Sequence, residues 1–151
     1  MSEVIFRSAT RADVPAILEL LENDEITRSR VVSEAADADY WKAFEEIDAD
    51  PRNELIVADD EGTVVGTCQL TFTPSLSRRG AERMTIEAVR VRSDRRGGGL
   101  GREMMRWALQ RARERGCGLA QLTTDKRRTD AQRFYAGLGF VATHEGMKLT
   151  L

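Results

Sequence analysis

The sequence predicts a mixed α/β (α+β) domain whose first half is largely antiparallel. Two observations predict this class. Apolar residues alternate with period two over 4–10 and within 54–76, whereas they recur with helical spacing over 101–115. With 151 residues, 41% of them hydrophobic and 32% charged, the chain is expected to form one domain, 1–151, with a substantial core.

The first elements are expected to be a strand and two helices. Residues 4–10 alternate as a strand, and the spacing of Thr10 and Asp13 predicts a helix start with a capping box. Residues 24–36 are polar and show no assignable pattern. A second helix is expected over 37–47, and the following Asp-Ala-Asp-Pro ends it because proline disfavours helix in the residue before it.

The remaining elements alternate between strands and helices. Two strands within 54–76 are joined by a turn at 60–62, and a further strand covers 83–92. The elements expected after it are a helix over 101–115 that ends at Gly116, a short buried strand over 119–125, a compact helix over 130–139, and one or two last strands within 140–151.

The charges are distributed unevenly along the chain. Residues 1–75 have a net charge of −11, whereas residues 76–115 have a net charge of +7. A basic middle suits an anionic ligand and an acidic front suits a cationic one. Equally, the two regions can carry solvated charges that fold against one another.

Several classes of protein are excluded. No apolar run reaches the roughly 20 residues that a membrane-spanning helix needs, and the first residues lack the basic and apolar regions of a secretory signal. Cys68 and Cys117 do not form a disulfide framework, so a reduced, cytoplasmic protein is expected. One histidine, His144, and two scattered cysteines make no metal site, and all three are interpreted as structural, the cysteines as buried small hydrophobes.

A glycine-rich loop precedes the helix expected over 101–115. Glycines let backbone amides converge on a phosphate at a helix N-terminus. The Walker pattern is excluded because no lysine follows these glycines, and the dinucleotide pattern is excluded because Arg102 or Met104 stands where its last glycine belongs. The pattern R-x-x-G-x-G fits, at Arg96, Gly99 and Gly101.

Together, the strand "MTIEAVRV", the loop "RRGGGLG", the amphipathic helix and the segment "AQRFYAGLGF" (131–140) resemble the GNAT family of N-acetyltransferases. The resemblance implies a sheet of six to seven strands flanked by about four helices and splayed at strands four and five. It also implies transfer of an acetyl group from acetyl-CoA to a primary amine, by direct attack in a ternary complex and without a metal. A small-molecule acceptor is expected, and a homodimer is compatible with the family.

The resemblance also implies which residues bind the cofactor. The main chain of the fourth strand would carry the pantetheine arm, and the glycine loop would bind the pyrophosphate. The residues concerned are Val89 and Val91 in the strand, and Arg96, Gly97, Gly98, Gly99, Gly101 and Arg102 in the loop.

Two residues are expected to transfer protons. Glu87 lies in an otherwise apolar strand, where a carboxylate costs free energy unless it is paired or has a function. It is interpreted as the general base. The alternative is a solvent-facing glutamate or one paired to Arg90. Tyr135 matches the tyrosine that the family uses as general acid, and the alternative is an amphipathic core residue beside Phe134.

One departure from the family concerns the residue after the fifth strand, where many members have an asparagine. This chain has Asp125, followed by basic residues 126–128 that either meet the 3′-phosphate of coenzyme A or form a solvated loop.

The acceptor is suggested by the acidic segment 22–48, whose aromatic residues Tyr40, Trp41 and Phe44 suit a small cationic amine or belong to the core. The segment "LTTDKRRTDAQRFY" is similar to aminoalkylphosphonate N-acetyltransferases, which implies Arg30 or Arg90 as the partner of an anionic substrate group.

A second class remains open, namely a non-catalytic acyl-CoA-sensing or transcription-associated regulatory module on the same fold. Basic residues within 78–115 could then contact nucleic acid. A sequence pI of about 5.6 disfavours this, and neither nucleic acid nor a membrane is expected as a partner.

Overall fold

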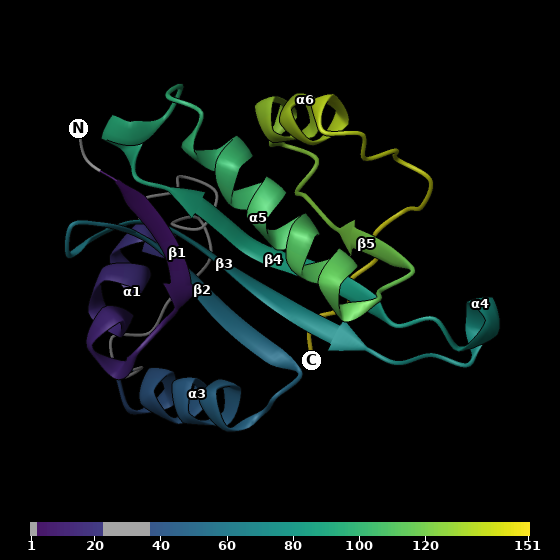
Figure 1. Ribbon diagram of the computed structural model, residues 1–151, viewed down its shortest axis with the longest axis horizontal. Coiled ribbons are helices and arrows are strands. Elements are labelled where there is room, and N and C mark those ends of the chain that lie inside the picture. Colours follow the sequence, from purple (N-terminus) through teal and green to yellow (C-terminus); the bar gives the residue numbers. More distant parts are fainter. Residues whose placement is uncertain (1–2, 23–36) are drawn as a thin grey trace.

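The computed structural model describes residues 3–22 and 37–151, which form a five-stranded sheet with helices on both faces (Figure 1). The strands lie in the order β1-β2-β3-β4-β5, and all neighbours are antiparallel except the parallel pair β4–β5. Their bounds are β1 Val4–Ser8, β2 Asn53–Asp60, β3 Thr63–Thr73, β4 Arg83–Val91 and β5 Leu119–Leu122. The predicted mixed, mostly antiparallel class is confirmed.

The expected number of six to seven strands is wrong for the described residues, which form five. Residues 140–151 were expected to supply the last one or two strands, but they contain no strand. A strand requires a neighbouring backbone with which to exchange hydrogen bonds. No such neighbour within the described part of the chain pairs with this segment, although its sequence pattern is that of a strand.

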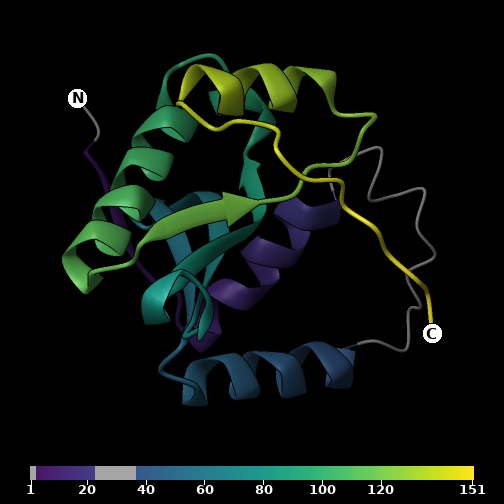
Figure 2. The same ribbon diagram turned by 90° about the vertical axis from the view of Figure 1, so that its right-hand side faces the viewer.

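The described helices are five, where about four were expected. In Figure 2, α5 and α6 lie on one side of the sheet and α1 lies on the other. The additional helix, α4, is a single turn in which Arg78 and Arg79 have left-handed φ angles of 52° and 60°. The bounds are α1 Val14–Glu22, α3 Asp37–Ala49, α4 Ser77–Gly80, α5 Leu100–Arg115 and α6 Thr129–Gly137, and short 3₁₀ turns cover Arg11–Asp13 and Ser93–Arg95. None of these helices is long and apolar enough to span a bilayer.

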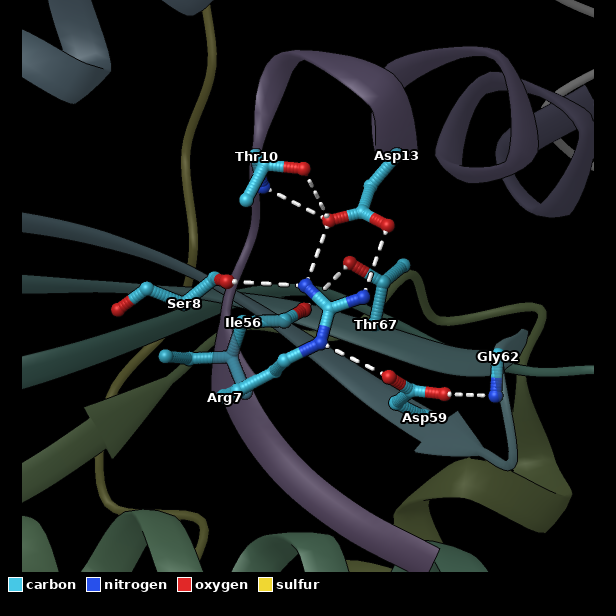
Figure 3. A network of polar contacts seen from close by, with 8 residues as sticks. All are labelled: Arg7, Ser8, Thr10, Asp13, Ile56, Asp59, Gly62 and Thr67. Atoms are coloured by element: carbon cyan, nitrogen blue, oxygen red, sulfur yellow. Dashed lines mark hydrogen bonds and ion pairs between the residues drawn. The ribbon is translucent and has the colours of Figure 1, made fainter.

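A polar network around Arg7 connects β1, the start of α1 and the β2–β3 hairpin (Figure 3). The Arg7 guanidinium donates from Nη1 to Asp13 Oδ2 (2.7 Å) and from Nε to Asp59 Oδ2 (2.9 Å). The Thr10 amide also donates to Asp13 Oδ2 (2.7 Å), which confirms the predicted Thr10–Asp13 helix start. Asp59 in turn accepts from the Gly62 amide (2.7 Å) in the predicted hairpin turn.

The main core lies between the sheet and α5, where helical and strand periodicities meet. On α5 the buried residues recur at helical spacing, so they form one continuous apolar face. Alternate residues of β3 and β4 supply the opposing surface. The buried residues of this core are Met104, Met105, Ala108 and Ala112 from α5, Ile56 from β2, Cys68, Leu70 and Phe72 from β3, and Met84 and Ile86 from β4.

The two cysteines differ from one another. Cys68 is completely buried, as expected for a small hydrophobe, and its burial raises the pKa of its thiol to about 12. Cys117 was expected to be buried as well, but it is only half-buried, and its Sγ lies 3.7 Å from Glu82 Oε1. Cys117 follows the end of α5, where the chain turns at the surface of the sheet, so its side chain is not enclosed.

The charge asymmetry of the sequence resolves into ion pairs within the fold. Arg95, next to the glycine loop, donates to Asp60 at the end of β2 (2.5 Å). Arg111 on α5 forms a two-pronged pair with Glu54 on β2. Basic residues of the middle of the chain therefore neutralise acidic residues of its first half, which supports the interpretation of charged regions that fold against one another.

Candidate functional site

Strands β4 and β5 separate halfway along β4. They are paired only from Arg83–Leu119 to Ile86–Leu122, after which β5 ends and β4 continues to Val91. At the same place Ala88 has a φ of 53° and the register between β3 and β4 shifts, which is the geometry of a β-bulge. Among the described residues, the β5-facing edge of β4 therefore has no strand beside it after Ile86, while the other edge stays paired with β3.

Main-chain carbonyls on this open part of β4 are covered by arginine side chains. The Val89 carbonyl accepts from Arg90 Nη1 (2.8 Å), and the Val91 carbonyl accepts from Arg96 Nε (3.3 Å). The side chains of both valines pack against the main core. The main-chain carbonyls of Val89 and Val91, the residues expected to bind the pantetheine arm, thus lie at this edge, and Arg96 lies beside them.

The glycine loop leads from β4 to the N-terminus of α5. Gly97 and Gly99 have φ angles of 81° and 86°, which side chains disfavour, and Gly99 caps the helix without a side-chain hydrogen bond. The first hydrogen bond of α5 runs from the Glu103 amide to the Gly99 carbonyl (3.0 Å), so the amides of 99–102 at the helix N-terminus have no partner within the helix. These amides and the helix dipole form a site suited to an anion.

The two sequence motifs meet at Gly101. A Cβ atom at this position would lie 3.5 Å from Phe134 Cζ and 3.6 Å from Val91 Cγ2. The last glycine of the loop motif therefore packs between α6 and the end of β4. This contact places α6, which carries Tyr135, against the same end of the sheet as the loop.

Tyr135 lies half-buried between two aromatic rings. Its ring centroid is 5.2 Å from that of Phe134 and 5.9 Å from that of Phe140, both in edge-to-face geometry. Burial raises the pKa of the Tyr135 phenol above its usual value, although the positive charge of Arg90 acts in the opposite sense. The phenol therefore carries its proton at neutral pH.

Glu87 projects from the opposite face of the sheet. Met84 and Ile86 point into the core under α5, so the alternation of β4 places Thr85 and Glu87 on the other face. Glu87 is exposed and pairs in register with Gln69 of β3. Of the two structural alternatives open for this residue, the geometry agrees with a solvent-facing glutamate, and exposure also leaves the carboxylate accessible to an amine.

A row of neutral polar side chains, which sequence reasoning missed, lies beside Glu87. Asn53, Thr71, Thr85 and Gln121 are neighbours in register across β2 to β5. Asn53 Oδ1 accepts from Thr71 Oγ1 (3.0 Å), and Gln121 Nε2 donates to Thr85 Oγ1 (3.1 Å). The signal was present in "TCQLTFT" and "MTIE", where every second residue is polar.

The aromatic residues expected near an acceptor are engaged in the fold. Phe44 is buried, and Trp41 carries the Arg11 guanidinium 4.4 Å above its ring. Their use as core and surface packing was the alternative left open by the sequence. Arg30, considered as the partner of an anionic group, lies outside the described residues.

The remaining candidates lie on the surface after β5. His144 is exposed, with Nδ1 2.6 Å from Thr143 Oγ1. The Asp125 carboxylate accepts from the backbone and guanidinium of Arg127 (3.0 Å each), so it orders the turn before α6. Within residues 3–22 and 37–151, no grouping of histidine, cysteine and carboxylate side chains suits a metal ion.

One hollow lies apart from these residues. It is lined by α1, the β2–β3 turn and Arg92, and it includes Asp13, Glu19 and Thr63. It contains none of the predicted site residues, so it is not the site indicated by the motifs.

Comparisons with known proteins agree with the motifs. A family profile described as the acetyltransferase (GNAT) family matches residues 15–140. An aminoalkylphosphonate N-acetyltransferase from Salmonella typhimurium is 36% identical over 59 residues, which are 39% of this chain and 38% of that protein. A streptothricin acetyltransferase from Streptomyces lavendulae is 34% identical over 93 residues, 62% of this chain and 46% of that protein. The matches thus span less than half of either curated relative.

A solved structure is similar along nearly the whole chain. It is that of a transcriptional regulator from Bacillus halodurans, which is 47% identical, covers 99% of this chain and 100% of its own, and superposes with a TM-score of 0.94. The profile match covers the open edge of β4, the glycine loop and α6, the three features of the candidate site. On this basis, the chain belongs to the acetyltransferase (GNAT) family.

Proposed function

We propose that this protein transfers an acetyl group from acetyl-CoA to the primary amine of a small molecule, with residues 1–151 acting as one acetyltransferase domain. The observation that carries the proposal is the N-terminus of α5, where the amides of 99–102 have no partner within the helix, next to the part of the β5-facing edge of β4 that β5 leaves unpaired. A diphosphate group suits the amides, and an extended amide-containing arm suits the edge. Acetyl-CoA has both parts.

In this proposal the cofactor is held mainly by main-chain groups. The pyrophosphate binds the amides of Gly97, Gly98, Gly99, Gly101 and Arg102, and the pantetheine arm pairs with the main chain of Val89 and Val91. Because Arg90 and Arg96 now donate to the two valine carbonyls, the arm would replace these contacts. The released Arg96 guanidinium would then be free to pair with phosphate.

Glu87 is proposed as the general base. An alkyl amine has a pKa near that of lysine, about 10.4, so it must lose a proton before it can attack a thioester. Glu87 is exposed on the face opposite α5, beside the gap that opens after Ile86. An amine on this face could reach a thioester lying in the gap, and its proton would pass to Glu87 directly or through water.

Tyr135 is proposed as the general acid. The departing coenzyme A thiolate is stabilised when it takes up a proton, because a thiol has a pKa of about 8.5. The pKa of Tyr135 is raised by burial, so the phenol holds its proton until a basic group approaches. Amine attack and thiolate protonation would therefore occur on the two sides of one gap in the sheet, without a covalent enzyme intermediate.

The acceptor is proposed to be a small polar amine. The curated relatives are named for an aminoalkylphosphonate and for streptothricin, both small molecules. The row of Asn53, Thr71, Thr85 and Gln121 offers neutral hydrogen-bonding groups beside Glu87. Arg90, half-buried on β4, is the described residue that we propose as the partner of an anionic acceptor group.

A regulatory module is kept as a second candidate because the 47% identical solved structure is described as a transcriptional regulator. Its sequence basis is weakened by the fold, since Arg95, Arg111 and Arg115 of the basic middle are paired with carboxylates. We favour the enzyme, and we place it in the cytoplasm because its two cysteines are unbridged.

The test combines binding with turnover. Calorimetry with acetyl-CoA should show binding, and thiol release across a panel of aminoalkylphosphonates, aminoglycosides, polyamines and lysine peptides should rise above the amine-free rate for at least one small amine. Binding without turnover on any amine would favour the regulatory module. If acetyl-CoA does not bind, both the acetyltransferase and the acyl-CoA-sensing regulatory module are excluded.

A further inference from the structure

A chain of three polar side chains leads from the end of α3 to the residue opposite Glu87. Asp50, which follows α3, accepts from Asn53 Nδ2 at Oδ2 (2.9 Å) and from the Arg52 amide at Oδ1 (2.9 Å). Asn53, at the start of β2, accepts at Oδ1 from Gln69 Nε2 on β3 (3.2 Å). The turn after α3 and strand β2 thus hold one half-buried side chain of β3 in place.

The direction of this hydrogen-bond chain is determined by the Asp50 carboxylate. An ionised carboxylate only accepts hydrogen bonds, so the Asn53 side chain turns its NH2 group toward Asp50 and its carbonyl oxygen toward Gln69. The same oxygen also accepts from Thr71 Oγ1 (3.0 Å). Gln69 must then offer its own NH2 group to Asn53, so its carbonyl oxygen, Oε1, lies at the other end of the amide.

Gln69 and Glu87 lie opposite one another on the face of the sheet that is turned away from α5. They are partners in the β3–β4 register, and the β carbons of such partners are about 5 Å apart. Asn53 lies on the β2 side of Gln69 and Glu87 lies on its β4 side. Because Nε2 is used on the β2 side, Oε1 is the end of the amide available on the β4 side. No donor reaches Oε1 in the described parts of the chain.

We propose that Gln69 binds the amine acceptor together with Glu87, with Oε1 accepting a hydrogen bond from the nitrogen whose proton Glu87 removes; this inference rests on the proposed acetyl transfer. A carbonyl oxygen accepts from an ammonium group and from the neutral amine that forms when one proton has passed to Glu87. The lone pair of the neutral amine is then free to attack the thioester carbon.

The protons of the acceptor nitrogen are accounted for in this arrangement. Of the three on the ammonium group, one passes to Glu87 and one is released to water once the nitrogen–carbon bond has formed. The carbon–sulfur bond breaks with its electron pair on sulfur, which takes the proton of Tyr135. The third proton stays on the amide product, and it is the one that Gln69 holds.

Asp50 and Asn53 are positioning residues for Gln69. If the Gln69 amide were reversed, its NH2 group would face the amine and would donate to the lone pair that has to attack the thioester. The same NH2 group would also repel an ammonium group. The Asp50 carboxylate, two hydrogen bonds away from Gln69, thereby determines whether the site accepts a hydrogen bond from the acceptor or donates one to it.

The direct test replaces the Gln69 amide by an apolar group of similar length. Gln69→Met should raise the KM of the best amine about tenfold, the lower end of the loss for a hydrogen bond to a charged group. The KM of acetyl-CoA should stay within about twofold of wild type, because the cofactor does not contact this side chain. Gln110→Met, at an exposed position of α5, is the control and should leave both KM values unchanged.

A stricter test reverses the hydrogen-bond chain and then restores it. Asp50→Asn keeps an oxygen for the Arg52 amide and turns an NH2 group toward Asn53, which reverses the two amides behind it. This variant should lose about tenfold in kcat/KM for the amine. The double variant Asp50→Asn/Asn53→Asp again gives Gln69 Nε2 a carboxylate to which it donates, so kcat/KM should return to within about threefold of wild type.

Circular dichroism establishes that each variant is folded, and Asp48→Asn, at an exposed position of α3, is the control for the loss of a charge. If Gln69→Met does not fold, Asp50→Asn and the double variant decide the question. An unchanged amine KM in folded Gln69→Met, or a double variant no more active than Asp50→Asn, would overturn the role of Gln69 and leave acetyl transfer intact. A wild type that acetylates no amine would overturn this inference together with the proposed function.

Discussion

At the residue scale, the best-defined polar contact is the pair of Arg7 and Asp13. Asp13 is only 8% exposed, and its hydrogen bonds from Arg7, aided by that from the Thr10 amide, lower its pKa to about 2. A carboxylate with a lowered pKa stabilises the folded state fully above its ordinary value of 3.8, and this contribution is lost as the pH falls toward 2.

Asp13→Asn should therefore lower the free energy of unfolding by on the order of 2 kcal/mol at pH 7. The difference from wild type should shrink between pH 4 and pH 2, because both proteins are then uncharged at this position. Urea unfolding at several pH values measures this. Asp48→Asn, at an exposed position of α3, is the control and should change stability by less than about 0.5 kcal/mol. A difference independent of pH would exclude the carboxylate as its cause.

Also at the residue scale, Glu87→Gln should slow acetyl transfer by about a hundredfold at pH 7, the lower end of the usual effect of a general base. The defect should diminish above about pH 8, where more of the amine is already neutral. The measurement is the pH profile of kcat/KM for the best amine of the panel. Glu46→Gln, exposed on α3, should match wild type at every pH. An unchanged profile in Glu87→Gln would remove this residue from the mechanism.

At the element scale, the function of the loop depends on the backbone conformation before α5. Gly99 has a φ of 86° and no neighbour within 4 Å of a Cβ, so a side chain would strain the backbone without a clash. Gly62, in the hairpin turn, has a φ of 93° and equally open surroundings. The two glycines thus have the same conformational requirement, but only one belongs to the proposed cofactor site.

Gly99→Ala and Gly62→Ala should each destabilise the fold by about 1 kcal/mol. Only Gly99→Ala should also weaken acetyl-CoA binding, by about tenfold or more, because the loop amides would no longer converge. Calorimetry on both variants, with circular dichroism to confirm folding, separates the two effects. Equal acetyl-CoA affinities in the two variants would count against the loop as the pyrophosphate site.

At the scale of the whole molecule, acetyl-CoA should bind the folded state alone, because its site combines the open edge of β4 with the end of α5. Acetyl-CoA at about a hundred times its Kd should therefore stabilise the fold by about 2.7 kcal/mol, which for a chain of this length raises Tm by about 5–10 °C. Differential scanning calorimetry measures the shift. Adenosine without the phosphates is the control ligand and should give little or no shift.

Local signals in the sequence predicted most elements. The Thr10–Asp13 spacing, the turn at 60–62 and the glycine at the end of α5 each act within a few residues, so they can be interpreted without the fold. The exposure of Cys117 and the packing of Trp41 under Arg11 depend on residues distant in sequence. These features could not be derived from local pattern.

The sequence by itself determined the family, the glycine loop and the two motifs, because each depends on the order and spacing of residues along the chain. Only the tertiary structure decided that β4 leaves β5 after Ile86, that Gly101 packs against Phe134, and that residues 140–151, expected to form the last strands, pair with no strand among the described residues. The physical reason is that alternation predicts a strand but does not choose its neighbour. Pairing depends on which backbone edges the folded sheet leaves open.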